Sequence, residues 1–107
     1  MLTTTPDDLR LLEDKAEEAS RLLKLIANDR RLLILCRLIG EGEMTVTAMA
    51  EAVGLGQSAL SQHLARMRDE RLVTYRREGT TLYYRIADPK VERVIALLKE
   101  LYCTPLN

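Results

Sequence analysis

The spacing of apolar side chains changes along this chain of 107 residues, and the change constrains the fold strongly. In the first two thirds, apolar residues recur at intervals of three and four, which is typical of amphipathic helices. Between Leu72 and Ala87, apolar or aromatic residues alternate with polar ones, which indicates a β-hairpin. The helical spacing returns after Pro89. The sequence therefore predicts one small domain of helices with a single hairpin.

Caps and turns divide the helical part. Thr45 and Ser58 are both expected to be N-caps, since their side-chain oxygens accept bonds from the free N–H groups of a first turn. Gly54 suits the left-handed position after a helix, and Gly40 and Gly42 are expected to end an earlier one. The predicted helices span residues 7–27, 29–39, 46–53, 58–71 and 89–103, and the hairpin spans residues 73–87 with its turn at 78–81.

Two sets of apolar residues are predicted to be buried. The run Leu32–Cys36 is apolar on every side of its helix, and Leu60, Leu64 and Met67 form the inner stripe of another. The first and last helices, 7–27 and 89–103, carry apolar stripes that either pack on their own chain or meet a second copy. The roughly 60 residues between them bury too little surface for comfortable stability alone, so we expect a homodimer built from these two helices.

Two helices joined by a short glycine-containing turn and followed by a hairpin describe a winged helix-turn-helix. The predicted class is mainly α with a β-hairpin, in the order ααααββα, and residues 1–107 form a single DNA-binding domain. Residues 46–71 are its helix-turn-helix and 73–87 its wing. Gln and Ser side chains at the start of a recognition helix suit base edges and phosphates in a major groove. The candidates there are Gln57, Ser58, Ser61 and Gln62, with Arg66 behind them and Arg76 and Arg77 on the hairpin.

Each of these residues has an ordinary alternative role. The serines can simply cap a helix, His63 can be an exposed or half-buried helix histidine, and the arginines can form a solvated face. The charges favour the DNA interpretation when taken together. The chain has 16 basic and 16 acidic residues, but residues 1–56 carry a net −3 and residues 57–107 a net +3. A neutral chain with this polarity is expected to bind DNA through a limited, salt-sensitive set of phosphate contacts.

Three segments of the chain resemble the ArsR/SmtB family of bacterial winged-helix repressors. They are Leu32–Cys36, Gln57–Arg68 and Tyr83–Ile86, and the resemblance covers roughly residues 20–103. It implies a homodimer that binds a palindromic operator on double-stranded DNA and represses transcription until an inducer is sensed. It also implies which residues face DNA: Gln57, Ser58, Ser61, Gln62 and His63 in the recognition helix, and Arg76, Arg77, Thr80 and Thr81 in the wing.

The inducer depends on the two cysteines. Zinc prefers four Cys or His ligands, and this chain has only Cys36, Cys103 and His63, so no metal site or cofactor is expected. The placement of Cys36 and Cys103 is similar to that in the BigR, SqrR and HlyU group of the family. It implies a dithiol switch that responds to reactive sulfur species or oxidants. Three alternatives stay open: two structural cysteines without a switch, a sensor of trivalent arsenic, and a DNA-binding member with no inducer.

An enzyme is not expected. Ser61 and His63 are two apart on a helix and so face different directions, which excludes a nucleophile–base pair between them. The run Gly54–Ala59 matches a dinucleotide-binding pattern in letters only, because it follows a helix rather than a strand. A winged helix that binds protein instead of DNA is the remaining alternative. The sequence shows no signal peptide and no apolar run that would cross a membrane, so we expect the protein in the cytoplasm.

Overall fold

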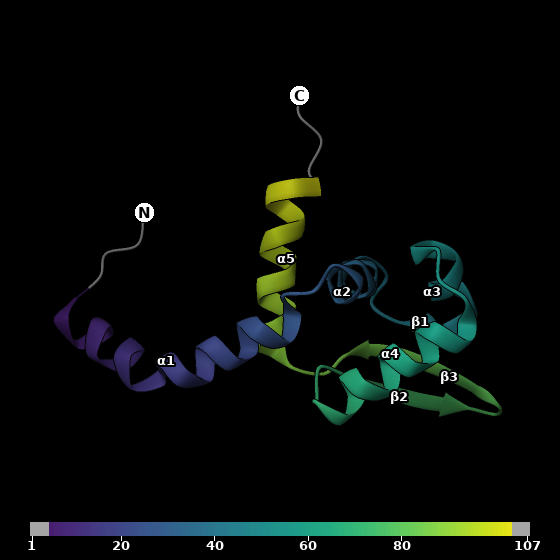
Figure 1. Cartoon of the computed structure of the whole chain (residues 1–107), viewed down its shortest axis with the longest axis horizontal. Helices are drawn as coiled ribbons and strands as arrows, with labels where there is room; N and C mark the ends of the chain where they lie inside the picture. The colour runs from purple at the N-terminus through teal and green to yellow at the C-terminus, as the bar shows by residue number, and fades with distance from the viewer. Residues whose placement is uncertain (1–4, 104–107) are drawn as a thin grey trace.

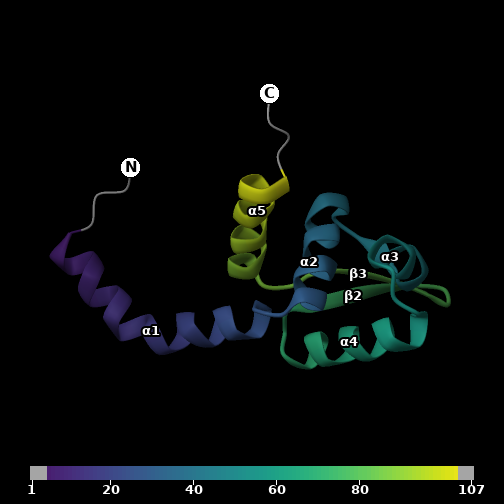
Figure 2. The ribbon, with the colours of Figure 1, turned by 45° about the horizontal axis from the view of Figure 1, so that its top comes forward.

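The computed structural model describes residues 5–103, which form a three-stranded antiparallel sheet with helices packed around it (Figure 1). The sheet has the strand order β1-β3-β2, and α1 extends away from the rest of the molecule (Figure 2). This architecture confirms the predicted winged helix. Within the described residues the elements are α1 (Pro6–Ile26), α2 (Asp29–Glu41), β1 (Met44–Thr45), α3 (Val46–Val53), α4 (Gln57–Asp69), β2 (Val73–Glu78), β3 (Thr81–Ile86) and α5 (Pro89–Cys103).

The first two helices begin at side-chain caps. The Thr5 hydroxyl accepts from the Asp8 N–H at 3.1 Å while the Asp8 carboxylate accepts from the Thr5 N–H, which forms a complete capping box. The Asn28 side chain accepts from the N–H groups of Arg30 and Arg31 at the start of α2. That helix runs two residues beyond the expected Ile39, because Gly40 stays helical and the chain turns only at Gly42, where φ is +85°.

The helix-turn-helix pair is α3 followed by α4. The Thr45 hydroxyl caps α3 by accepting from the Ala48 N–H at 3.2 Å, and Gly54 leaves the helix in the left-handed region, as predicted. The expected cap at Ser58 is wrong. The Gly56 carbonyl already accepts from the Leu60 N–H at 3.0 Å, so Gly56 is the N-cap and Ser58 lies inside the first turn. The helix also ends two residues before the expected Arg71, which takes the left-handed region at φ +64°.

The hairpin pairs residue by residue from Val73 opposite Ile86 to Glu78 opposite Thr81. Its turn consists of the two residues between those ends, with Gly79 at φ +64°, which a residue without Cβ adopts without strain. The two-residue strand β1 joins β3 by pairing Met44 with Tyr84 and was not predicted. A strand of two residues is too short to show an alternating pattern, so no sequence signal marks it.

The core lies between α2, α4, α5 and the sheet. Leu60, Leu64 and Met67 are fully buried, which confirms the predicted inner stripe of α4. The expected burial of the whole Leu32–Cys36 run is wrong in part, because α2 packs through one face only. Ile34 and Leu35 are buried, Leu32 and Cys36 are half-buried, and Leu33 is 50% exposed.

The two terminal helices keep much of their apolar surface in solvent. In α1 only Ile26 is buried, and it joins the core at the end of the helix. In α5, Val91 and Ile95 are buried, whereas Leu101 and Tyr102 are exposed. Exposed apolar patches of this kind mark interaction surfaces. Across residues 5–103, no helix combines the length and the apolar composition needed to cross a bilayer.

Candidate nucleic-acid interface and thiol pair

The outward face of α4 is polar and uncharged at its start. Burial of Leu60 and Leu64 orients the helix, and the same rotation leaves Ser58, Ser61 and Gln62 exposed. The first turn contains no acidic residue and no side chain caps its N–H groups. These groups therefore point into solvent with the partial positive charge of a helix N-terminus, which favours a phosphate. Arg66 is exposed farther along, and His63 is half-buried between the two faces.

Gln57 connects the two helices of the helix-turn-helix. Its side-chain amide donates to the Thr47 hydroxyl at 3.2 Å, so it reaches back to the start of α3. The pair is exposed, and the amide oxygen is left to accept a further bond. The structure thus places Gln57 at the edge of the α4 face, where it contributes to the geometry of the pair as well as to the surface.

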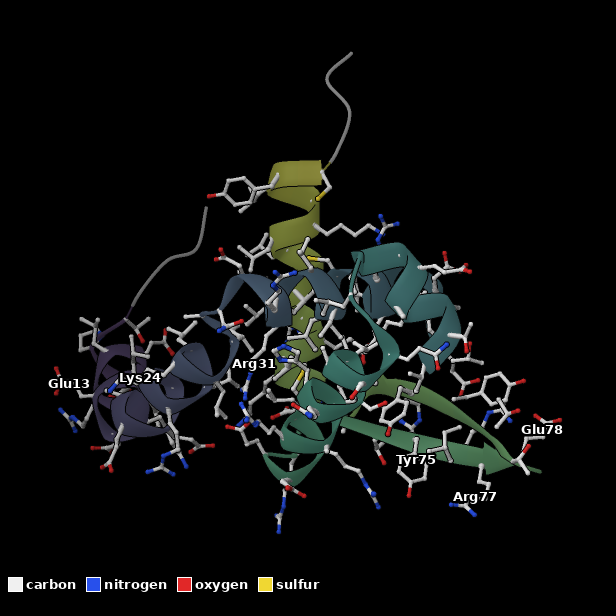
Figure 3. The ribbon with its side chains drawn as sticks, turned by 45° about the vertical axis from the view of Figure 1, so that its right-hand side comes forward. Glu13, Lys24, Arg31, Tyr75, Arg77 and Glu78 are labelled. Atoms are coloured by element: carbon white, nitrogen blue, oxygen red, sulfur yellow. The ribbon has the colours of Figure 1, made fainter. Side chains whose placement is uncertain are left out.

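The two wing arginines, Arg76 and Arg77, project from opposite sides of the sheet. Figure 3 shows Tyr75 and Arg77 projecting from the same side of β2, and the Arg68 guanidinium of α4 lies 4.2 Å from the centre of the Tyr75 ring. Arg77 is therefore on the α4 side of the sheet. Thr80 is exposed at the turn and Thr81 is half-exposed beside it. Arg77 and α4 therefore lie on the same side of the sheet.

The Arg76 guanidinium is already bound by two carboxylates and a tyrosine ring. Its Nε atom donates to Glu43 at 2.9 and 3.0 Å, its Nη1 atom donates to Glu78 at 2.8 Å, and its guanidinium lies 4.3 Å from the centre of the Tyr83 ring. The hydrogen bonds to Glu78, and then those to Glu43, raise the pKa of Arg76 above its ordinary value. A phosphate would have to compete with two carboxylates for this side chain. The sequence gives no indication of these contacts of Arg76. It also gives none of the contact between Arg68 and Tyr75.

The two cysteines lie on packed helices, with Cys36 on α2 and Cys103 as the last residue of α5. Both thiols are free, Cys36 is half-buried and Cys103 is exposed. Burial raises the pKa of Cys36, the nearby Cys103 raises it further, and the charge of Lys99 lowers it. Lys99 reaches from α5 onto α2, since its Nζ atom lies only 2.8 Å from where a Cβ on Gly40 would be. Gly40 lies four residues after Cys36 on α2 and Lys99 lies four residues before Cys103 on α5, so this contact places the two thiols in the same region of the molecule.

Metal-binding residues do not gather in the part of the chain that the structure describes. Between residues 5 and 103, no group of three or more His, Cys, Asp or Glu side chains is arranged to hold an ion.

Comparison with known proteins assigns the family. Residues 28–75 match the model of bacterial regulatory proteins of the arsR family. The HTH-type transcriptional regulator YgaV of Escherichia coli K12 is 43% identical over 96 residues, which cover 90% of this chain and 97% of YgaV. The reduced HlyU of Vibrio cholerae superposes with a TM-score of 0.79 at 42% identity, covering 89% of this chain and 99% of that one. The repressor BigR of Xylella fastidiosa gives 0.78 at 31% identity, covering 95% and 100%. The chain therefore belongs to the arsR family of bacterial regulatory proteins and is a DNA-binding transcriptional regulator.

Proposed function

We propose that the protein is a dimeric repressor that binds a palindromic operator. It dissociates from the operator when a disulfide or polysulfide bridge forms between Cys36 and Cys103. The observation that carries the proposal is the placement of two free thiols on the packed helices α2 and α5, each four residues from the contact between Lys99 and Gly40. The helix α2 belongs to the winged body, which we define as residues 29–86, whereas α5 ends in exposed apolar side chains. A bridge between them would act on both regions at once.

The dimer is supported by the apolar side chains that the single chain leaves uncovered. Leu9, Leu12 and Leu23 in α1 and Leu97 and Leu101 in α5 are at least half exposed. At about 25 cal/mol per Å², burial of several such side chains stabilises an association by several kcal/mol before the entropy of association is subtracted. A two-fold dimer places two α4 helices in successive major grooves, and this symmetry is matched by a palindromic operator.

DNA contact is supported by the surface that combines α4 with the wing. We assign Ser58, Ser61 and Gln62 to base edges and phosphates, with Gln57 and His63 at the border of this face. Arg66 and Arg77 supply phosphate contacts, and Thr80 and Thr81 lie at the tip of the wing. Arg76 contributes less than Arg77, because two carboxylates already hold it. Domain boundaries follow the same division: residues 46–71 read DNA, 73–87 form the wing, and 7–27 and 89–103 form the dimer.

The chemistry of the switch begins at the exposed thiol. The Cys103 thiolate attacks a terminal sulfur of a polysulfide and expels a shorter polysulfide, which leaves a persulfide on Cys103. The Cys36 thiolate then attacks the Cys103 sulfur, expels hydrosulfide and forms a disulfide. If Cys103 carries a longer sulfur chain, the Cys36 thiolate attacks a sulfur of that chain other than Cys103 Sγ, expels hydrosulfide or a shorter polysulfide, and forms a polysulfide bridge. With peroxide, Cys103 forms a sulfenic acid and releases water, and Cys36 displaces a second water.

The order of attack follows from burial. Because burial raises the pKa of Cys36, a smaller fraction of it is thiolate at neutral pH, whereas Cys103 is open to reagents. We expect iodoacetamide to label Cys103 before Cys36 in the reduced protein, and labelling of Cys36 to accelerate as the pH is raised and more of this thiol becomes thiolate. Faster labelling of Cys36 at neutral pH would reverse the proposed order.

One experiment tests the switch directly. The reduced protein is treated separately with polysulfide, peroxide, oxidised glutathione and arsenite, and operator affinity is measured beside the masses of tryptic peptides 32–37 and 100–107. We expect affinity to fall by about 5–150-fold, as is typical of allosteric coupling, in step with a bridged peptide pair. Unchanged affinity after both thiols have reacted rejects the switch, and release by arsenite alone indicates a metalloid sensor.

The matched variants are Cys36→Ser and Cys103→Ser. Each should bind the operator like the reduced parent and should no longer respond to polysulfide, since a single thiol cannot form the internal bridge. If either reduced variant loses operator binding, the cysteine has a structural role instead.

A further inference from the structure

Arg31 joins three elements that are otherwise separate in the sequence. Its Nη1 atom donates to the Leu25 carbonyl near the end of α1 at 2.8 Å, and its Nη2 atom donates to the Glu70 carboxylate at the end of α4 at 2.5 Å. Arg31 itself belongs to the first turn of α2, and Figure 3 shows it between the end of α1 and α4. One planar guanidinium therefore holds the end of an outer helix and the end of the recognition helix together.

Glu70 is fixed to the end of α4 by backbone hydrogen bonds. Glu70 is the C-cap, and its N–H donates to the carbonyls of Arg66 and Arg68. The following residues close the helix end, because Arg71 is left-handed and the Leu72 N–H donates to the Met67 carbonyl at 2.8 Å. A displacement of the Glu70 carboxylate therefore requires either a change of its side-chain rotamer or a movement of the end of α4.

The Leu25 side is the place where α1 meets the body. Ile26 is buried, while Leu22 and Leu25 are half-buried against the core, and the rest of α1 extends away (Figure 2). A second polar link joins Glu18 of α1 to Lys90 of α5 at 3.1 Å, and these side chains are 55% and 70% exposed. The Arg31 and Glu70 side chains are only 16% and 34% exposed, so solvent screens their interaction much less.

We infer that Arg31 is a positioning residue. It couples the position of α1, the proposed dimer helix, to the orientation of α4, the proposed recognition helix. The inference rests on the proposed dimer, in which the angle of α4 sets the distance between the two reading helices. The observation that carries it is the simultaneous bonding of Arg31 to the Leu25 carbonyl and the Glu70 carboxylate. In a dimer whose two protomers both keep these Arg31 hydrogen bonds, the two recognition helices fit one spacing between the operator half-sites.

The test compares operators that differ in spacing. An operator is selected from random duplex DNA by the wild-type protein, and a second duplex carries one additional base pair between the half-sites. We expect the wild type to bind the altered duplex at least tenfold more weakly. Glu70→Gln and Arg31→Lys should each reduce that ratio to about threefold or less and should weaken binding to the parent operator, because the recognition helix is no longer held at one angle. Urea denaturation of each variant checks that the fold persists.

Lys90→Gln is the matched control, since it removes the exposed ion pair between α1 and α5 without touching α4. It should keep the wild-type spacing ratio. If Glu70→Gln and Arg31→Lys keep that ratio as well, the coupling is wrong, even if their affinity falls. If Lys90→Gln relaxes it equally, the effect belongs to α1 in general and not to Arg31. A wild type that is indifferent to spacing rejects the proposed two-fold reading of DNA itself, which is a different failure.

Discussion

Leucine side chains are buried in the winged body of the molecule and exposed on its first helix, α1. In the body, Leu35, Leu60 and Leu64 are fully buried, whereas Leu11 and Leu12 in α1 are about 60% exposed. Both regions show the same apolar spacing in sequence, yet only the body supplies partners within the chain. The difference teaches that the same apolar spacing gives a buried core in the winged body and an uncovered stripe on α1, and exposed stripes of this kind are typical of interaction surfaces.

The largest expected effect comes from the body. Leu35→Ala removes a fully buried side chain and should lower the free energy of unfolding by about 2–5 kcal/mol, from lost burial and the cavity that remains. Urea denaturation followed by circular dichroism measures it. Leu33→Ala on the same helix is the control, since Leu33 is half exposed and should cost clearly less. Equal losses would contradict the contrast between the two faces of α2.

The second effect tests the outer helix. Leu9→Ser combined with Leu12→Ser should weaken dimerisation at least tenfold, about 1.4 kcal/mol, because both exposed side chains then lose their apolar contact with the partner. Sedimentation velocity over a range of protein concentrations measures this change. Arg10→Ser combined with Glu13→Ser has the same spacing and a similar helix propensity cost. Dissociation in that control, or its absence in the leucine variant, would place the interface elsewhere.

A third prediction applies the same contrast to the wing. Arg77→Gln should lower the slope of log affinity against log salt by about 1 for each protomer, because one phosphate contact is lost. Arg76→Gln should change the slope less, since Glu43 and Glu78 already neutralise Arg76 within the body. Fluorescence anisotropy between about 50 and 200 mM salt, where affinity falls steeply with each phosphate contact, distinguishes the two. A larger change for Arg76 would show that DNA displaces both carboxylates.

The smallest expected effect is a gain in stability. Arg71 is the described non-glycine residue with a left-handed backbone, at φ +64°, and such a conformation costs about 1–2 kcal/mol for an L-residue. Arg71→Gly should therefore raise the free energy of unfolding by roughly 0.5–1 kcal/mol, after the greater flexibility of glycine in the unfolded chain is subtracted. Arg71→Ala should give no such gain. A loss of stability in the glycine variant would indicate that the arginine side chain packs productively.

Much of the candidate site could be predicted from local patterns. The 3.6-residue spacing predicted that Leu60, Leu64 and Met67 face inward, and therefore that Ser58, Ser61 and Gln62 face outward, as the structure confirms. The cap at Ser58 was wrong because Gly56 and Ser58 are both acceptable caps, and the packing of Leu60 decides where the helix begins. The strand β1 was missed because its pairing with Tyr83 and Tyr84 comes from residues almost forty positions away.

The sequence by itself determined the five helices, the hairpin, the buried stripe of α4 and the polarity of charge between the two halves, since these follow from neighbours within a few residues. The tertiary structure alone decided which charged side chains are free. Arg76 meets Glu43 across 33 positions and Arg31 meets Glu70 across 39, and no spacing rule links such pairs. It also decided that the leucines of α1 stay exposed, because burial depends on whether another surface is near and not on the periodicity of the helix.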